Sequence, residues 1–296
     1  MNRKITIILA AVAMAATIAS ARTVRRTLSI FEPAVPETET IADAKMEFVY
    51  NYTWLHDTTR TIDDDATTSD RMLLQIAPDG LSKFSSYTNL AVDSLIISST
   101  REQIVNAAID GKLKAGEFMT IYKNYPNAGC LTHTEKICRD WFRYEEPMPD
   151  FHWELTDSVV TILGYECRGA QCDFRGRHWT AFYCEDIPVM EGPWKLCGLP
   201  GLIMLAEADG GEYTFECVGI NSHANRPLTI YKVPFNKTTR HQYYDTKNRY
   251  DINPYAYYEA TGGGHVTVTD ENGNPTPDAY DPNELTFDYI ERDWKR

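Results

Sequence analysis

The sequence predicts a mainly β protein, built as a strongly curved antiparallel sheet or half-barrel with one or two helices packed on it. Short segments rich in Tyr, Phe, Trp, Val, Ile and Thr recur along the chain, with turn-forming residues every ten or so positions. Six Trp, 18 Tyr and 11 Phe residues are enough to cover one side of a large sheet. These observations favour sheet over helix as the main element.

The elements are predicted from these patterns in chain order. The β core is expected to span residues 43–235, and one helix is expected at Arg101–Leu113, where apolar residues have helical spacing after Ser98-Ser99-Thr100. A second, weaker helical pattern lies around Lys237–Arg249. The expected strands are Glu47–Leu55, Met72–Ile76, Phe118–Tyr125, Lys136–Tyr144, Phe151–Leu155, Tyr165–Phe174, Arg177–Glu185, Leu202–Ala206 and Tyr213–Ile220.

Residues 236–296 are predicted to form a C-terminal extension, packed on the core or appended to it. Within the extension, His265–Thr269 alternates apolar and polar residues and is followed by Asn272-Gly273, a strong hairpin turn signal. The extension is therefore expected to carry a hairpin.

The N-terminus has the pattern of a secretory signal. A basic head precedes the apolar run Ile5–Ile18, and Ala19-Ser20-Ala21 offers the small residues of a cleavage site. The run is shorter than the roughly 20 residues that span a bilayer, so no transmembrane segment is expected after cleavage. Residues 1–21 are therefore predicted to be removed, with 22–42 as an extended linker, and the protein to be exported to the periplasm, the outer envelope or the medium.

The charge of the chain argues against a nucleic-acid partner. Among 296 residues, 29 Lys and Arg stand against 42 Asp and Glu, which gives a formal net charge of −13. Removal of Arg3 and Lys4 with the signal makes the mature chain still more acidic. Such a chain has no basic field to displace the counterions of nucleic acid.

The segments Tyr165–Phe174 and Arg177–Glu185 predict a hairpin with a two-residue turn at Arg175-Gly176. In that register, residues whose numbers sum to 351 face each other, so Cys167 faces Cys184 at a position where a cross-strand disulfide can close. Two separate buried thiols are the alternative, and the register also sets Glu166 opposite Glu185, which argues against it. Cys spacing alone does not fix the connectivity.

A segment rich in Gly and Pro follows the hairpin. Pro200-Gly201 has the order that a type II turn requires, and Gly198 stands just before it. Trp194, Leu196 and Leu199 make the segment too apolar for an ordinary solvated loop. We predict that Gly198, Pro200 and Gly201 form a fixed structural turn that delivers the chain into the next strand.

The run Gly198-Leu199-Pro200-Gly201-Leu202-Ile203 resembles the sequence that names the GLPGLI family, exported proteins of Bacteroidetes such as Porphyromonas, of uncharacterised activity. Cys172, Cys184 and Cys197 depart from the usual pattern. The resemblance implies an exported, largely β protein, often encoded near outer-membrane TonB-dependent receptors, and it brings no catalytic residues. It extends over Trp153, Leu155, Ile162, Gly164-Tyr165, Cys167, Ala170, Phe174, Gly176-Arg177, Trp179, Ala181, Tyr183, Ile187-Pro188 and Gly192-Pro193-Trp194, and over a variant of the family's ending at Tyr280–Leu285.

The motif has two interpretations. In the first it is a folding device that closes one end of the core. In the second it is a binding lip, with Trp194, Leu199 and Pro200 as candidate residues that contact a lipid, a peptide or a receptor.

The sequence contains no nucleophile elbow, zincin motif or phosphate-binding loop, and its seven Cys include no Cys-x-x-Cys step. We therefore predict no catalytic residues, no cofactor and no metal site. The favoured function is a non-enzymatic binding or accessory protein for an apolar ligand or an outer-membrane receptor system. The alternative is an exported hydrolase acting on peptide or glycan, with Asp or Glu and His assembled by the fold, and a third possibility is a purely structural secreted factor.

Overall fold

The structure, a computed structural model, describes residues 35–56, 58, 62, 66–109, 114–265 and 288–295. The chain divides into two compact units, each described by itself. The sheet unit comprises Pro36–Thr88, Gly116–Thr246 and Thr286–Arg296, and the helical unit comprises Met1–Val35, Asn89–Ala115 and Lys247–Leu285. The predicted signal and the predicted C-terminal hairpin lie outside the described residues, apart from His265.

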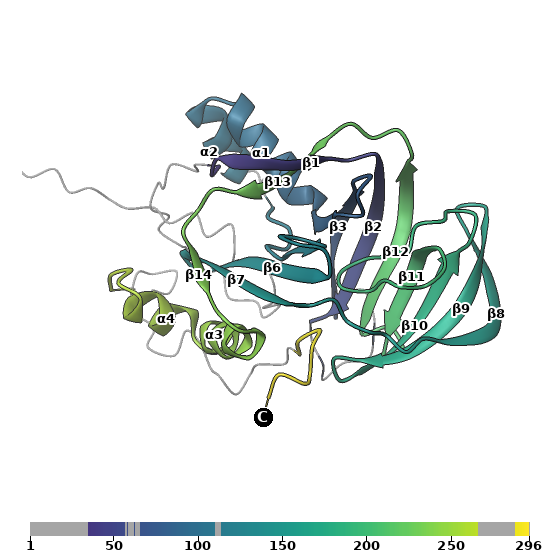
Figure 1. Cartoon of the computed structure of the whole chain (residues 1–296). Helices are drawn as coiled ribbons and strands as arrows, with labels where there is room; N and C mark the ends of the chain where they lie inside the picture. The colour runs from purple at the N-terminus through teal and green to yellow at the C-terminus, as the bar shows by residue number, and fades with distance from the viewer. Residues whose placement is uncertain are drawn as a thin grey trace, which may run out of the picture. The chain divides into compact units, whose positions relative to one another are not determined.

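The sheet unit is built on a 12-stranded sheet in the order β14-β7-β6-β5-β4-β3-β2-β12-β11-β10-β9-β8 (Figure 1). Its neighbours are antiparallel except β14 and β7, which are parallel. The predicted mainly β class is thus confirmed. The strands are β2 (Met46–Leu55), β3 (Thr67–Ile76), β4 (Ser82–Ser86), β5 (Thr120–Lys123), β6 (Cys130–Ile137), β7 (Asp140–Pro147), β8 (Glu154–Ile162), β9 (Tyr165–Phe174), β10 (Arg177–Cys184), β11 (Leu202–Ala208), β12 (Tyr213–Asn221) and β14 (Phe235–Lys237).

The predicted strong curvature and half-barrel are wrong. The sheet is open, with β14 at one edge and β8 at the other, and it is not strongly curled. It is not closed, because β14 pairs with β7 and β8 pairs with β9, and the two edge strands do not pair with each other. β13 (Pro227–Tyr231) pairs with β1 (Thr38–Asp43) in a separate two-stranded sheet. Residues 38–42 of the predicted linker therefore belong to a strand.

The described residues contain four helices: α1 (Tyr87–Ser98), α2 (Arg101–Ile109), α3 (Arg240–Ile252) and α4 (Pro254–Ala260). α2 and α3 correspond to the two predicted helices. α4 begins at Pro254, whose fixed φ suits the first helical position, and the Asn253 side chain accepts a hydrogen bond from the backbone N–H of Ala256. The first part of α3 belongs to the sheet unit, where Tyr243 packs on His133 of β6 and Tyr144 of β7.

The core of the sheet unit is a row of stacked rings that crosses the strands. Tyr52 of β2 stacks on Phe215 of β12 at 4.6 Å between ring centroids, and Phe215 lies 6.2 Å from Trp179 of β10. Trp194 continues the row at 5.5 Å from Trp179. These four side chains are buried. Aromatic pairs at such separations add about 0.5–1.5 kcal/mol each beyond the burial of their area.

The β9–β10 hairpin has the predicted register. Arg177 pairs with Phe174, Trp179 with Cys172 and Tyr183 with Arg168, so each pair of numbers sums to 351. Trp179 and Ala181 are buried, as the apolar face requires. The ladder ends at Arg168 and Tyr183, and Glu185 lies 3.8 Å from the Arg168 guanidinium. The two acidic residues that seemed to oppose the register are therefore accommodated beyond the paired residues.

Candidate functional site

A buried lysine of the sheet holds the turn segment (residues 191–203) in place. Lys123 of β5 donates hydrogen bonds to Glu191 Oε2 at 2.8 Å, to the Gly192 carbonyl at 2.8 Å and to the Leu196 carbonyl at 2.9 Å. An ammonium group has three donors, and all three are used here. A buried charge is tolerated only when it is paired and hydrogen-bonded, so Lys123 serves to hold the turn segment against the sheet.

Lys195, inside the turn segment, is the centre of a second buried cluster. Its Nζ lies 2.6 Å from Glu291 Oε1, in the segment of residues 288–294. It also forms a short ion pair with Glu146 of β7. Its third partner is the Tyr144 hydroxyl at 3.2 Å. The side chains of Lys195 and Glu291 are fully buried. This ion pair connects the turn segment to the last residues of the chain.

Two arginines complete the Lys195 cluster. Arg240 Nη1 of α3 donates to Glu291 Oε2 at 2.7 Å and to Asp293 Oδ1 at 2.6 Å, and Arg175 of the hairpin turn pairs with Glu146 Oε2 at 2.5 Å. Lys195, Arg175 and Arg240 thus balance three carboxylates, those of Glu146, Glu291 and Asp293. The cluster has no net formal charge with which to attract an ionic substrate.

Glu291 is ionised although it is buried. Burial alone would raise its pKa, but Lys195, Arg175 and Arg240 outweigh burial and lower the pKa below its ordinary value. The carboxylate is held in its charged form, which suits a permanent ion pair.

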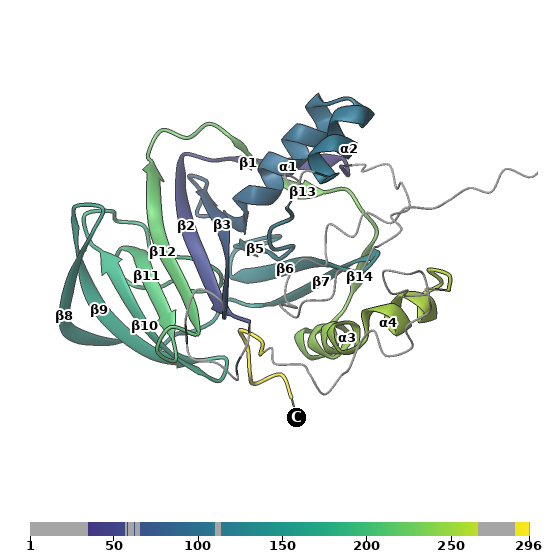
Figure 2. The same cartoon turned by 180° about the vertical axis from the view of Figure 1, so that it is seen from behind.

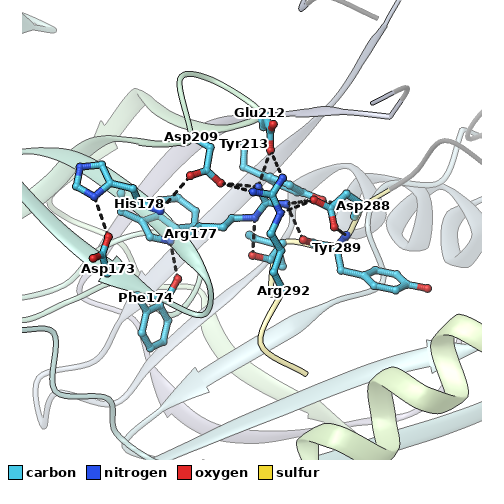
Figure 3. Close-up of polar contacts among 12 residues, drawn as sticks. Asp173, Phe174, Arg177, His178, Asp209, Glu212, Tyr213, Asp288, Tyr289 and Arg292 are labelled. Carbon is cyan, nitrogen blue, oxygen red and sulfur yellow. Dashed lines mark hydrogen bonds and ion pairs between the residues drawn. The ribbon is translucent and has the colours of Figure 1, made fainter. Parts of the chain in front are cut away.

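Arg177, the first residue of β10, is the centre of a third cluster (Figure 3). Nε donates to the Ile290 carbonyl, Nη1 to Asp209 and Glu212, and Nη2 to Asp288 and the Tyr289 carbonyl, at 2.7–2.9 Å. All five guanidinium N–H groups are therefore occupied. Arg292 bonds to the same three carboxylates from the more exposed side.

A buried histidine adjoins the Lys195 cluster. His133 stacks on Tyr144 at 4.7 Å, and its Nε2 lies 3.3 Å from Glu135 Oε2, which also accepts a short hydrogen bond from Tyr243. Burial lowers the pKa of His133, and Glu135 only partly offsets that effect. His133 is therefore neutral at pH 7, and a carboxylate partner places its proton on Nε2, which leaves Nδ1 without a partner among the described residues.

These three clusters share one physical property: the cation at the centre of each, Lys123, Lys195 or Arg177, is surrounded by partners of the chain itself. A site that binds an anionic substrate keeps donors available for it, whereas Arg177 and Lys123 have none left. Lys195 faces three partners of the chain, Tyr144 and Glu146 through hydrogen bonds and Glu291 through an ion pair. The clusters fix the turn segment and residues 288–294 to the sheet. The Lys195 and Arg177 clusters hold residues 288–294, the C-terminal segment, by ion pairs and hydrogen bonds, and we call this arrangement the clasp.

The structure places the predicted binding residues inside the core. Trp194 and Leu199 are buried, and Pro200 is exposed. Trp194 is held between Trp179 and Phe174. Trp194 and Leu199 are therefore not presented to solvent in this structure, because both side chains lie in the core.

The predicted turn differs in type. Gly198 has a φ of +91°, as a glycine-dependent turn needs, but Gly201 has no positive φ, so Pro200-Gly201 is not a type II turn. The Gly201 N–H donates to the Leu199 carbonyl at 2.8 Å, which closes a three-residue turn centred on Pro200. Gly201 is needed for space: a Cβ there would lie 2.1 Å from the Cys184 carbonyl oxygen.

The predicted disulfide is not formed. Cys167 and Cys184 are free buried thiols, close enough for Cys184 to share a hydrogen bond with Cys167. Burial raises the pKa of Cys167 to about 11, with Cys184 adding to the shift. The thiolate that attacks in disulfide exchange is therefore scarce at this position.

Sequence reasoning missed the clasp. A lysine within the apolar run Trp194–Leu196 was a signal for a buried ion pair, and Tyr289, Ile290 and Trp294 among the charged final residues were a signal that the end of the chain packs. Neither signal identifies the residues that these groups contact, since those residues lie far away in the sequence.

None of the helices in the described part of the chain has the length and apolar character needed to span a membrane. Within the same residues, no three His, Cys, Asp or Glu side chains converge as they would around a metal ion.

Comparison with known proteins gives a limited result. Residues 174–205, which include β10 and the turn segment, match the model of a family described as "Protein of unknown function (Porph_ging)". No curated protein matches the chain. Two solved structures of PNGF-II, in the P21 and C2 space groups, are similar at 12% and 13% identity with TM-scores of 0.43 and 0.44; they cover 68% and 69% of this chain. The matched part is 32% of each PNGF-II chain, so this chain spans about a third of their length.

Proposed function

We propose that this chain is an exported, non-enzymatic binding protein of the cell envelope that works by contact with another protein. The proposal rests on one observation: the buried cations of the chain have their hydrogen-bond and ion-pair partners within the chain itself. Arg177, Lys195 and Lys123 are the groups most suited to bind or activate a substrate, and each is surrounded by hydrogen-bond or ion-pair partners within the chain. This is the pattern of a rigid scaffold.

A protein partner is favoured over an apolar ligand. The apolar face of the sheet is covered in part by the chain's own Trp194, which stacks on Trp179 of β10, and Leu199 is buried in the same core. A ligand that occupied this face would have to displace both. An outer-membrane receptor of the TonB-dependent kind is the partner that we propose, on the family resemblance of the sequence.

The test uses mature chain, residues 22–296, with a cross-linker attached at exposed lysines in intact envelopes of the source cells. We expect cross-links to one class of outer-membrane protein, identified by mass spectrometry, and secretion that depends on residues 1–21. Chain that carries residues 1–21 and still stays cytoplasmic, or mature chain that cross-links no envelope protein, contradicts the proposal.

A hydrolase is the second candidate, and one observation favours it: His133 and Glu135 form a hydrogen-bonded pair with the Tyr243 hydroxyl. His133 and Glu135 are both buried, which places the pair away from a substrate in solution. Peptide and glycan substrates should therefore not be turned over. Turnover that His133→Gln abolishes while the far-UV circular dichroism is unchanged would establish the hydrolase instead.

A further inference from the structure

Strand β8 is the edge of the 12-stranded sheet (Figure 2). Among the described strands it pairs only with β9, through residues such as Val160 with Cys167 and Ile162 with Tyr165. An antiparallel strand directs half of its backbone groups to each side, so an edge strand presents a row of N–H and C=O groups to any added strand. β8 has nine residues, enough for several such hydrogen bonds.

The apolar side chains of β8 are exposed. Leu155 and Val159 on the strand are 66% and 55% exposed, and Leu163 in the turn that follows is 50% exposed. They are three of the eight large hydrophobic side chains exposed among the described residues, and they fall within nine positions. Single exposed apolar residues are ordinary, but a group along an edge strand is the composition of an interaction surface.

The charges on β8 are all of one sign. Glu154 and Asp157 are exposed, the strand contains no Lys or Arg, and Asp150 is exposed just before it. Edge strands are commonly protected by charges and by bulges, and β8 has a register shift between Leu155 and Val159. Protection accounts for the carboxylates, but it does not account for Leu155, Val159 and Leu163, which a protective edge would replace with polar residues.

We propose that β8 is a docking edge that accepts an extended, basic segment of a partner protein as an added strand. Backbone hydrogen bonds supply the pairing, Leu155 and Val159 contact apolar residues of the added strand, and Glu154 and Asp157 pair with its Lys or Arg side chains. A second copy of this chain is the disfavoured occupant, since its β8 carries only acidic charges and offers no cation to Glu154 and Asp157. The proposal rests on the proposed binding function and names the chemistry of its partner.

The probe for the test is a 12-residue peptide that alternates Lys with Val and Thr, with a Glu-for-Lys peptide as its matched control. Fluorescence anisotropy measures the affinity of full-length mature chain for each. We expect the Lys peptide to bind and the Glu peptide not to bind at 50 mM salt. Two cross-strand charge pairs predict that E154K/D157K weakens the Lys peptide about threefold to tenfold.

Apolar contact is tested by Val159→Arg, with Ile97→Arg as the control at another exposed apolar residue of the described chain. Val159→Arg should weaken binding further, whereas Ile97→Arg should leave it unchanged. Peptide binding should also slow amide exchange in residues 154–162. Equal affinity of the two peptides, or no protection of these amides, would overturn the proposal.

Analytical ultracentrifugation tests the other occupant, a second copy of this chain, by measuring the oligomeric state. A dimer that Val159→Arg dissociates assigns β8 to self-association and overturns the basic partner. If the peptide fails to bind β8 while envelope cross-links persist in Val159→Arg, the docking edge fails and the binding function stands.

Discussion

The ion pairs of the Lys195 cluster differ in how much they contribute to stability, because some are buried and others are exposed. The Lys195 ammonium group contacts Tyr144, Glu146 and Glu291, all within the chain. Breaking a buried pair by removal of one partner commonly costs about 3–5 kcal/mol, because the other charge is left uncompensated. An exposed pair contributes about 0–1 kcal/mol. The cluster contains both kinds.

The first prediction compares Glu291→Gln with Asp293→Asn. Glu291 is fully buried and Asp293 is partly exposed, and each change removes one carboxylate that contacts Arg240. Glu291→Gln should lower the free energy of unfolding by about 3 kcal/mol or more and Asp293→Asn by less than about 1 kcal/mol. Urea unfolding followed by Trp fluorescence measures both values. Equal effects would show that burial does not set the contribution of the cluster.

The second prediction concerns pH. The folded chain lowers the pKa of buried His133 below its ordinary 6.5, so below that pH the unfolded chain binds a proton that the folded chain does not. The contribution of neutral His133 to the free energy of unfolding is complete above about pH 6.5 and is lost as pH falls through the lowered pKa. Glu291 adds a further loss below its ordinary value of 4.5, since its folded pKa is also lowered.

Urea midpoints between pH 7 and pH 5 should therefore fall for the wild-type chain. His133→Gln should flatten this dependence, and His152→Gln, at an exposed histidine, should retain it. A wild-type midpoint that is constant from pH 7 to pH 5 contradicts the assignment of neutral buried His133.

At the scale of elements, the turn segment depends on two glycines for different reasons. Gly198 has a positive φ but open space around it, with Trp153 Nε1 4.0 Å from a hypothetical Cβ, whereas Gly201 faces the Cys184 carbonyl. Backbone strain at one residue costs about 1–3 kcal/mol, whereas a backbone collision requires the hairpin end and the turn to separate.

The third prediction is that Gly201→Ala destabilises the chain by more than about 4 kcal/mol and Gly198→Ala by about 1–3 kcal/mol. Both variants add one methyl group to the same segment, so the comparison isolates packing from strain. Denaturant unfolding or, for an insoluble Gly201→Ala, recovery in the soluble fraction measures the difference. A reversed order would contradict the packed position of Gly201.

The β9–β10 hairpin gives the fourth prediction. Burial raises the pKa of Cys172 and Cys217 to about 12, and Cys167 and Cys184 are also buried, whereas Cys130 and Cys138 are half-buried. Iodoacetamide at pH 8 should label native Cys130 and Cys138 and reach the buried thiols only after unfolding. An unreduced peptide map should contain alkylated Cys167 and Cys184; a peptide that links them would restore the sequence prediction of a disulfide.

At the scale of the sheet unit, residues 288–294 pack inside the fold. Residues 288–294 supply Asp288, the Tyr289 and Ile290 carbonyls, Glu291 and Asp293 to the buried cations of β10, the turn segment and α3. The Arg177 and Lys195 clusters can be complete only when the last residues have been positioned. The C-terminal segment is thus part of the core and not an appended arm.

The fifth prediction compares two truncations. Removal of residues 288–296 leaves Arg177 with two of its five partners and Lys195 without Glu291, and it should cost about 5 kcal/mol or more, most of the stability of a typical domain. Removal of residues 295–296 should have little effect, because Lys295 is exposed. Thermal unfolding of both chains measures the difference, and similar midpoints would contradict the clasp.

The sequence determined local features through local physics. The β9–β10 register follows from a two-residue turn and a period of two, and the structure has it residue for residue. The strand predicted at Lys136–Tyr144 is wrong, because β6 and β7 are separated by a turn in which Cys138 has a φ of +57° without a Gly, Pro or Asn to signal it. α1 was missed because its sequence is rich in β-branched residues.

Only the tertiary structure decided the charge clusters and the role of the turn segment. Lys195 meets Glu146 and Glu291 across 49 and 96 positions of sequence, and no periodicity encodes which carboxylate a buried cation will find. The same holds for Gly201, whose need for glycine comes from the Cys184 carbonyl of another element. Hydrophobic pattern and turn chemistry act between neighbours in sequence, so they fix elements; desolvation acts on groups brought together in space, so it fixes which charges and contacts the folded chain keeps.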